Sequence, residues 1–162
     1  MAILVIGMLC LGLYMTTLSS SPFKSKLYGW HKELGMLVLM LVTLRLTWRF
    51  SNVRPLLPQA LPAWQKLGAH AAHAALYFFM FLMPITGWLI TSAAGFPISF
   101  FGLFVIPTLI SASHHQMDRF EEIHQLLAYG LITVILVHTA AALKHHFIDK
   151  NTIFRRMLWP LQ

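Results

Sequence analysis

The sequence predicts an all-α integral membrane protein, a single domain of residues 1–162 folded as a four-helix bundle. Three observations support this prediction. Apolar residues make up 57% of the chain and charged residues only 10%, whereas soluble domains average about 25% charged residues. Four apolar segments have about the length that a membrane-spanning helix needs. Histidines recur within these segments, where an ionisable side chain is costly and usually has a function.

The first predicted span covers residues 2–18 and contains the small residues Gly7 and Gly12. A cleaved signal peptide is the alternative, but no basic segment precedes the apolar run. A short polar loop, residues 19–29, should follow and lead into the second span.

The second predicted span covers residues 30–50 and begins beside His31. Arg45 follows His31 by fourteen residues, which places both side chains on one helical face at opposite ends. The guanidinium of Arg45 either extends to the membrane surface or pairs with a carboxylate of a bound cofactor.

The third predicted span covers residues 67–90, because the prolines of the preceding segment exclude a helix across residues 52–62. His70 and His73 lie one turn apart near its start. Either imidazole could hydrogen-bond a cofactor edge or a quinone, or both could be ordinary interfacial polar residues. Further along, Pro84 should bend the helix near Thr86.

Residues 96–110 are apolar enough to suggest another span, but glycines and prolines interrupt them too often for a continuous helix. We therefore expect an interfacial loop that packs over one end of the bundle. His114 and His115 should lie in that loop as surface residues.

The fourth predicted span covers residues 121–144 and contains His124 and His138, fourteen residues apart on one face. This spacing is about four helical turns, or roughly 21 Å along the axis. Neutral imidazoles inside a membrane need a partner, and haem iron is a common one in a helix bundle. The alternative is that both histidines merely pack in the bundle or bond backbone carbonyls.

Placing four antiparallel helices side by side sorts the histidines by depth. His31 and His124 begin their spans on the same side, where a bis-histidine haem could bind between facing helices. His138 lies deeper, level with Arg45 and near the start of the third span, and would serve a second, inner haem. We therefore take His31, His124 and His138 as candidate haem-iron ligands, with Arg45 and His73 as further candidate cofactor-binding residues.

Small residues near the outer pair, Gly35, Ala128 and Gly130, should leave room for the porphyrin. The single cysteine, Cys10, excludes covalent attachment through a Cys-x-x-Cys-His motif and an iron–sulfur cluster held by four cysteines of this chain. Any haem would therefore be non-covalent. Two imidazole ligands fill the coordination sphere of the iron, which favours electron transfer over oxygen binding.

The chain has a net charge of +7, but its basic residues lie near the ends of apolar segments and form no compact patch. We therefore expect no nucleic-acid partner and a lipid bilayer around the helices. If four helices span the membrane, eight basic residues lie on one side of it and four on the other. The excess of positive charge predicts that both termini are cytoplasmic. Surface lysines at positions 24, 26 and 32 would then lie outside, together with several acidic residues.

The order of these features resembles the bacterial di-haem cytochrome b561 family. Its most specific part is the end of the chain, residues 142–152, reading ALKHHFIDKNT, followed by Arg155, Arg156 and Met157. The resemblance implies the cytochrome b fold of formate dehydrogenase and nickel–iron hydrogenase membrane subunits, two haem b groups and the bacterial inner membrane. It assigns His31 and His124 to the outer haem and His138 to the inner haem, and it places a membrane quinone near the inner haem.

Some members of that family oxidise superoxide at the outer face and pass the electron to quinone. The alternative function is a haem-bearing membrane anchor subunit for a peripheral dehydrogenase or hydrogenase. Whether the protein is an enzyme, and whether it forms a homodimer or binds a redox partner subunit, stays open at this point.

In one respect the sequence departs from the family pattern. The resemblance implies a histidine on the first helix, as the second inner ligand, at a position just upstream of Met1. No histidine precedes His31. We therefore expect either that the protein begins earlier than Met1 or that the inner site lacks this ligand, with His73 as a possible substitute.

Overall fold

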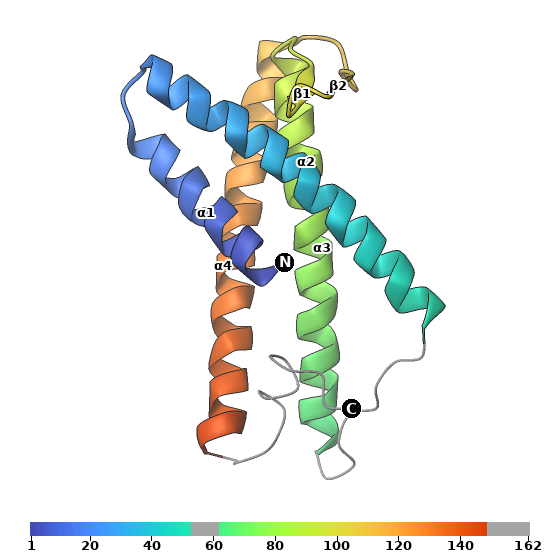
Figure 1. Ribbon diagram of the computed structural model, residues 1–162. Coiled ribbons are helices and arrows are strands. Elements are labelled where there is room, and N and C mark those ends of the chain that lie inside the picture. Colours follow the sequence, from blue (N-terminus) through green and yellow to red (C-terminus); the bar gives the residue numbers. More distant parts are fainter. Residues whose placement is uncertain (53–61, 149–162) are drawn as a thin grey trace.

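The computed structural model describes residues 1–52 and 62–148 (Figure 1). Its helices are α1 (Ala2–Thr17), α2 (Pro22–Ser51), α3 (Ala63–Ala93) and α4 (His114–Phe147). Two short strands, β1 (Ile98–Phe100) and β2 (Phe104–Ile106), lie between α3 and α4. The prediction of a mostly helical protein is confirmed, and the two strands are an addition to the predicted all-α class.

Helices α2 and α4 begin earlier than predicted because a serine caps each of them upstream of the predicted start. Ser21 caps α2 by accepting a hydrogen bond from the Lys24 backbone N–H at 3.2 Å, and Pro22 suits the first helical turn. Most of the predicted loop at residues 19–29 is therefore helical. Ser113 caps α4 in the same way, so His114 and His115 lie in the first turn of α4 and the prediction of loop histidines was wrong.

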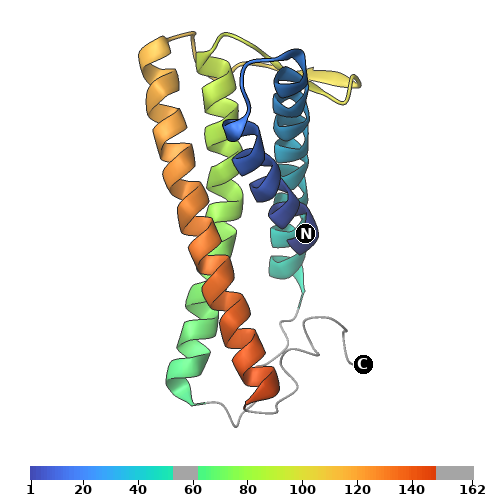
Figure 2. The ribbon, with the colours of Figure 1, turned by 90° about the vertical axis from the view of Figure 1, so that its left-hand side faces the viewer.

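Antiparallel helices α3 and α4 lie side by side along the bundle, and α2 crosses them obliquely (Figures 1 and 2). Helix α1 folds back against α2, with the N-terminus about halfway along the bundle. The largest buried cluster joins the helices through Val5, Val38 and Leu131, and partly buried side chains of α3 pack against it. The core is therefore a small cluster of apolar residues packed between long helices.

Three helices among the described residues, α2, α3 and the His114–Lys144 part of α4, are long and apolar enough to cross a membrane. Helix α1, with 16 residues, is shorter. Only 11–17% of the residues in the most apolar windows of the three long helices are buried inside the protein. Large apolar side chains such as Leu44 and Leu126, about 70% exposed, would be unfavourable in water. A surrounding bilayer accounts for this surface.

The segment after α3 is a β-hairpin that packs over α2. Strands β1 and β2 are antiparallel, with Phe100 opposite Phe104. The backbone reverses at Phe101 and Gly102, both with positive φ as type I′ turns require. Ile98 and Phe100 bury against Met36 of α2. The prediction that this segment packs over the bundle end without forming a spanning helix is confirmed, whereas its strands were not predicted.

Two polar side chains of α3 fix the segment that returns from the hairpin to α4. The indole N–H of Trp88 donates to the Pro107 carbonyl at 2.9 Å. Ser92, which is completely buried, accepts a hydrogen bond from the Leu109 N–H at 3.1 Å. The hairpin is therefore held both by apolar contacts with α2 and by hydrogen bonds to α3.

Candidate functional site

Four of the predicted site residues form two facing histidine pairs. In the upper pair, nearer the hairpin, His31 of α2 faces His124 of α4 with ring centroids 6.3 Å apart and ring planes at 75°. In the lower pair, His73 of α3 faces His138 of α4 with centroids 5.5 Å apart and planes at 58°. Helix α4 therefore contributes one imidazole at each level.

The upper pair has the spacing that an iron between two imidazoles requires. Metal ions bind imidazole nitrogen at about 2.0 Å, which leaves roughly 6 Å between the centres of two rings on opposite sides of the metal. The observed 6.3 Å between the His31 and His124 centroids agrees with this value. Two ring planes can meet the metal axis at any relative angle, so the 75° between them is also compatible.

The surroundings of the upper pair also fit two metal ligands. The Nδ1 atom of His31 is buried and has no hydrogen-bond partner among the described residues. Gly12 of α1 and Gly87 of α3 lie beside the rings, where an added Cβ would come within 3.2 Å of His31 Cε1 and 3.5 Å of His124 Cε1. The helices thus approach the two imidazoles closely, and no side chain is interposed at these positions.

One hydroxyl fixes the orientation of the His124 ring. Thr86 of α3 is buried, and its Oγ1 lies 2.8 Å from His124 Nδ1. Metal-binding histidines usually bond a second protein group through the ring nitrogen that does not bind the metal. Thr86 provides such a group for His124.

Gly130 was expected to leave room for a porphyrin, but an aromatic side chain fills the space beside it. A Cβ at Gly130 would lie 2.7 Å from the Phe79 ring, so this glycine accommodates an aromatic side chain of the neighbouring helix. The contact at Gly35 is ordinary, since an added Cβ would meet only Met8 at 3.8 Å.

Beside the lower pair lies a cluster of two arginines and a tyrosine. Arg45 Nε donates a hydrogen bond to the Tyr77 hydroxyl at 3.2 Å, and the Arg49 guanidinium lies 5.1 Å from the centroid of the Tyr77 ring. Tyr77 follows His73 by one turn on α3, so this cluster and the lower pair share one level of the bundle. Arg45 was a predicted site residue, whereas Arg49 and Tyr77 were not. Both lie one helical turn from a predicted residue, Arg49 four residues after Arg45 and Tyr77 four residues after His73, and this spacing could have indicated them.

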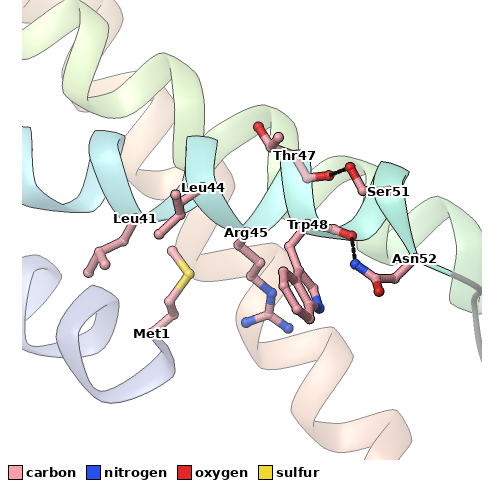
Figure 3. Close-up of a pocket in the computed structure, with 8 residues that line it drawn as sticks. All are labelled: Met1, Leu41, Leu44, Arg45, Thr47, Trp48, Ser51 and Asn52. Carbon is pink, nitrogen blue, oxygen red and sulfur yellow. Dashed lines mark hydrogen bonds between the residues drawn. The ribbon is translucent and has the colours of Figure 1, made fainter.

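Arg45 also lines an open pocket of about 630 Å³ on the surface of α2 (Figure 3). Its other walls are mainly apolar and include Trp48, Leu41 and Met1. The guanidinium therefore lies at the junction of the lower level of the bundle and an open, mainly apolar pocket.

The remaining histidine near the lower level does not join either pair. His70 is exposed, and its Nδ1 lies 2.7 Å from the Lys66 carbonyl of its own helix. This contact matches the alternative of an ordinary interfacial residue.

Among residues 1–52 and 62–148, no group of three or more His, Cys, Asp or Glu side chains could hold a metal ion. Two imidazoles alone are a poor metal site, because a protein metal centre usually takes four or more ligand atoms. A porphyrin supplies four nitrogens of its own, so paired imidazoles suit haem iron better than a free ion.

A family model described as prokaryotic cytochrome b561 matches residues 1–160. The protein named cytochrome b561 homolog 2 of Escherichia coli (strain K12) is 40% identical over 161 residues, which cover 97% of this chain and 84% of that protein. Cytochrome b561 homolog 1 of the same organism is 29% identical over 128 residues, covering 79% and 72% of the two chains. A probable superoxide oxidase of Yersinia pestis is 31% identical over 125 residues, covering 77% and 69%.

Proposed function

Because this chain belongs to the prokaryotic cytochrome b561 family, and is therefore a membrane b-type cytochrome, we propose that it carries electrons through a bis-histidine haem b at the upper pair. His31 and His124 would be the two axial ligands. The observation that most supports this assignment is the 6.3 Å separation of their facing rings. Haem iron with two imidazole ligands exchanges single electrons and has no open position for oxygen.

In this proposal the protein positions the two imidazoles and shields the haem from water. The ring of His31 on α2 has Gly12 of α1 against it, and the ring of His124 on α4 is hydrogen-bonded by Thr86 of α3. The buried cluster around Val38 and Leu131 lies between the same helices and excludes water.

The test is the absorbance spectrum of the reduced, purified protein in detergent. His31→Ala and His124→Ala should each abolish the α-band of the upper haem. His70→Ala is the matched control, since His70 is exposed and its Nδ1 contacts the Lys66 carbonyl of its own helix. Equal haem content in all three variants would refute the assignment of the ligands.

We propose a second haem b at the lower pair, with His138 as one axial ligand. His73 faces His138 at 5.5 Å between centroids and either contacts the edge of this haem or supplies its second ligand. Arg45 and Arg49 would pair with the haem carboxylates, because guanidinium groups bind carboxylates through two parallel hydrogen bonds. Tyr77 would hold Arg45 in place.

Haem stoichiometry distinguishes the two roles of His73. If His138→Ala loses one haem and His73→Ala keeps both, His73 only contacts the haem. If His73→Ala also loses one haem, His73 is its second ligand. Two haems retained in both variants would refute the proposal of a haem at the lower pair.

We propose a membrane quinone as the electron partner near the lower pair, where Arg45 lines an open, mainly apolar pocket. Superoxide is the proposed donor on the opposite side, because one relative is named a probable superoxide oxidase. The positive side chains of Lys24 and Lys26 near the start of α2 would attract this anion, although acidic residues share that side.

Rapid mixing of the oxidised protein with superoxide tests the donor, and anaerobic mixing of the reduced protein with a quinone tests the acceptor. Fast reduction followed by quinone-dependent reoxidation is the expected result. Electron transfer only in the presence of a co-purifying dehydrogenase or hydrogenase would instead support the anchor-subunit function.

The proposed membrane arrangement has four spans in the bacterial inner membrane, with both termini cytoplasmic. Helix α1 packs against α2 and most of its residues are apolar, which agrees with an intramembrane position. A C-terminal alkaline phosphatase fusion should be inactive and a fluorescent protein fusion active. The reverse pattern would refute the orientation.

A further inference from the structure

The buried hydroxyl of Thr86 contacts three polar groups. Its Oγ1 lies 2.9 Å from the Leu82 carbonyl, 2.9 Å from the Met83 carbonyl and 2.8 Å from His124 Nδ1. The side chain is 6% exposed, so bulk water does not compete for these contacts.

The chemistry of these groups decides which atom carries each proton. A hydroxyl has one proton to donate, and a carbonyl can only accept. Helical threonines commonly donate to a carbonyl three or four residues earlier, and both carbonyls lie at those positions. The Thr86 oxygen then accepts a hydrogen bond, and His124 Nδ1–H is the donor.

The protonation of the neutral His124 ring follows from this arrangement. With its proton on Nδ1, a neutral imidazole has its free lone pair on Nε2. The ring edge that carries Nδ1 and Cε1 faces α3, since an added Cβ at Gly87 would lie 3.5 Å from Cε1 and 3.9 Å from Nδ1. Thr86 therefore fixes the tautomer and the rotation of the ring together with the Met83 carbonyl, which also bonds His124.

We propose that Thr86 is a positioning residue that presents Nε2 of His124 to the haem iron and lowers the potential of the upper haem. The inference rests on the proposed function, in which His124 is an axial ligand. A hydrogen bond accepted from the second ring nitrogen makes an imidazole ligand more basic. A more basic ligand stabilises ferric over ferrous iron, so the bond favours the oxidised state.

The test compares three variants of the haem-loaded protein in a redox titration. Thr86→Val removes the hydroxyl and keeps the shape, and Thr86→Ser keeps the hydroxyl. The matched control is Thr91→Val, because Thr91 is also buried and bonds a carbonyl of the same helix, that of Gly87 at 3.0 Å, and no histidine of the described residues bonds it.

Thr86→Val should raise the midpoint potential of the upper haem and alter the electron paramagnetic resonance spectrum of its ferric state. A tenfold change in the ratio of ferrous to ferric iron corresponds to about 59 mV for one electron, and we expect a rise of up to this size. Thr86→Ser and Thr91→Val should stay at the wild-type potential.

Equal potentials and spectra in Thr86→Val and Thr91→Val would overturn the inference. If the valine variant does not fold, Thr86→Ala removes the hydroxyl without the extra methyl and is titrated in its place. Full haem content in His124→Ala would show that the proposed function itself had failed. Loss of haem in His124→Ala together with an unchanged potential in Thr86→Val would refute only the role of Thr86.

Discussion

Replacing Gly12 by alanine should disturb the upper pair from the side of α1. An ideal Cβ at Gly12 lies 3.2 Å from Cε1 of His31, whereas non-bonded carbon atoms prefer about 3.5–4.0 Å. The ring or the helix must therefore shift by roughly 0.3 Å or more. Metal–ligand distances vary by only about 0.2 Å around their usual values, so this shift is large enough to strain an iron–imidazole bond.

Two opposing energies set the expected size of the effect. Alanine is favoured over glycine inside a helix by about 0.8–1.0 kcal/mol, while overpacking a close contact typically costs about 1–3 kcal/mol. The difference leaves a net cost of up to about 2 kcal/mol. Since 1.4 kcal/mol is a factor of ten in an equilibrium constant, Gly12→Ala should weaken retention of the upper haem by up to roughly tenfold, to the extent that the strain falls on the haem-loaded protein.

Gly7→Ala is the matched control on the same helix. An added Cβ at Gly7 meets no atom within 4 Å, so this variant has the same gain in helix propensity and no clash. The measurements are haem per protein after dialysis against a haem-binding competitor, the midpoint potential and the thermal unfolding temperature. Identical haem retention and potential in the two variants would refute the inference that α1 restrains His31 as a ligand.

Three further predictions concern packing around the two levels. Ser92→Ala removes the acceptor for the buried Leu109 N–H and should cost about 1–3 kcal/mol of stability; an unfolding temperature equal to that of the wild type would contradict this. Gly130→Ala places a Cβ 2.7 Å from the Phe79 ring and should destabilise the bundle by about 1–3 kcal/mol. The double variant with Phe79→Leu should recover most of that loss, and no recovery would mean that the helix backbones clash instead. Tyr77→Phe removes the hydrogen bond to Arg45 and should shift only the potential of the proposed lower haem in a redox titration. A shift confined to the upper haem would argue against the arginine cluster as a carboxylate site.

The helices could be predicted from composition and apolar length, but their ends could not be predicted closely. Pro22 and the lysines after it suggested a loop, yet Ser21 and Pro22 form a good helix start, so α2 begins eight residues before the predicted boundary at residue 30. The hairpin was missed because glycines, prolines and aromatic residues are compatible with both an irregular loop and short strands.

The histidines could be predicted as candidate site residues because fourteen-residue spacing on one helix defines a face. Which ring faces which depends on the rotation and tilt of neighbouring helices, and sequence periodicity carries no information on either. The contact of Thr86 with His124 joins residues 38 positions apart and arises only when α3 and α4 pack. For the same reason the closeness of Gly12 to His31 could not be foreseen.

His124 and His138 lie on one uninterrupted helix, so the backbone geometry of α4 fixes the distance between them along the helix axis. Changes in the tilt of α1, α2 or α3 can move the partner rings, but they cannot lengthen the path along α4. Tunnelling between two redox groups weakens exponentially with distance, so this arrangement would protect the rate of transfer between the two proposed haems from substitutions elsewhere in the bundle. Its vulnerability lies within α4 itself, where one inserted residue between these histidines would turn one of them by about 100° relative to the other.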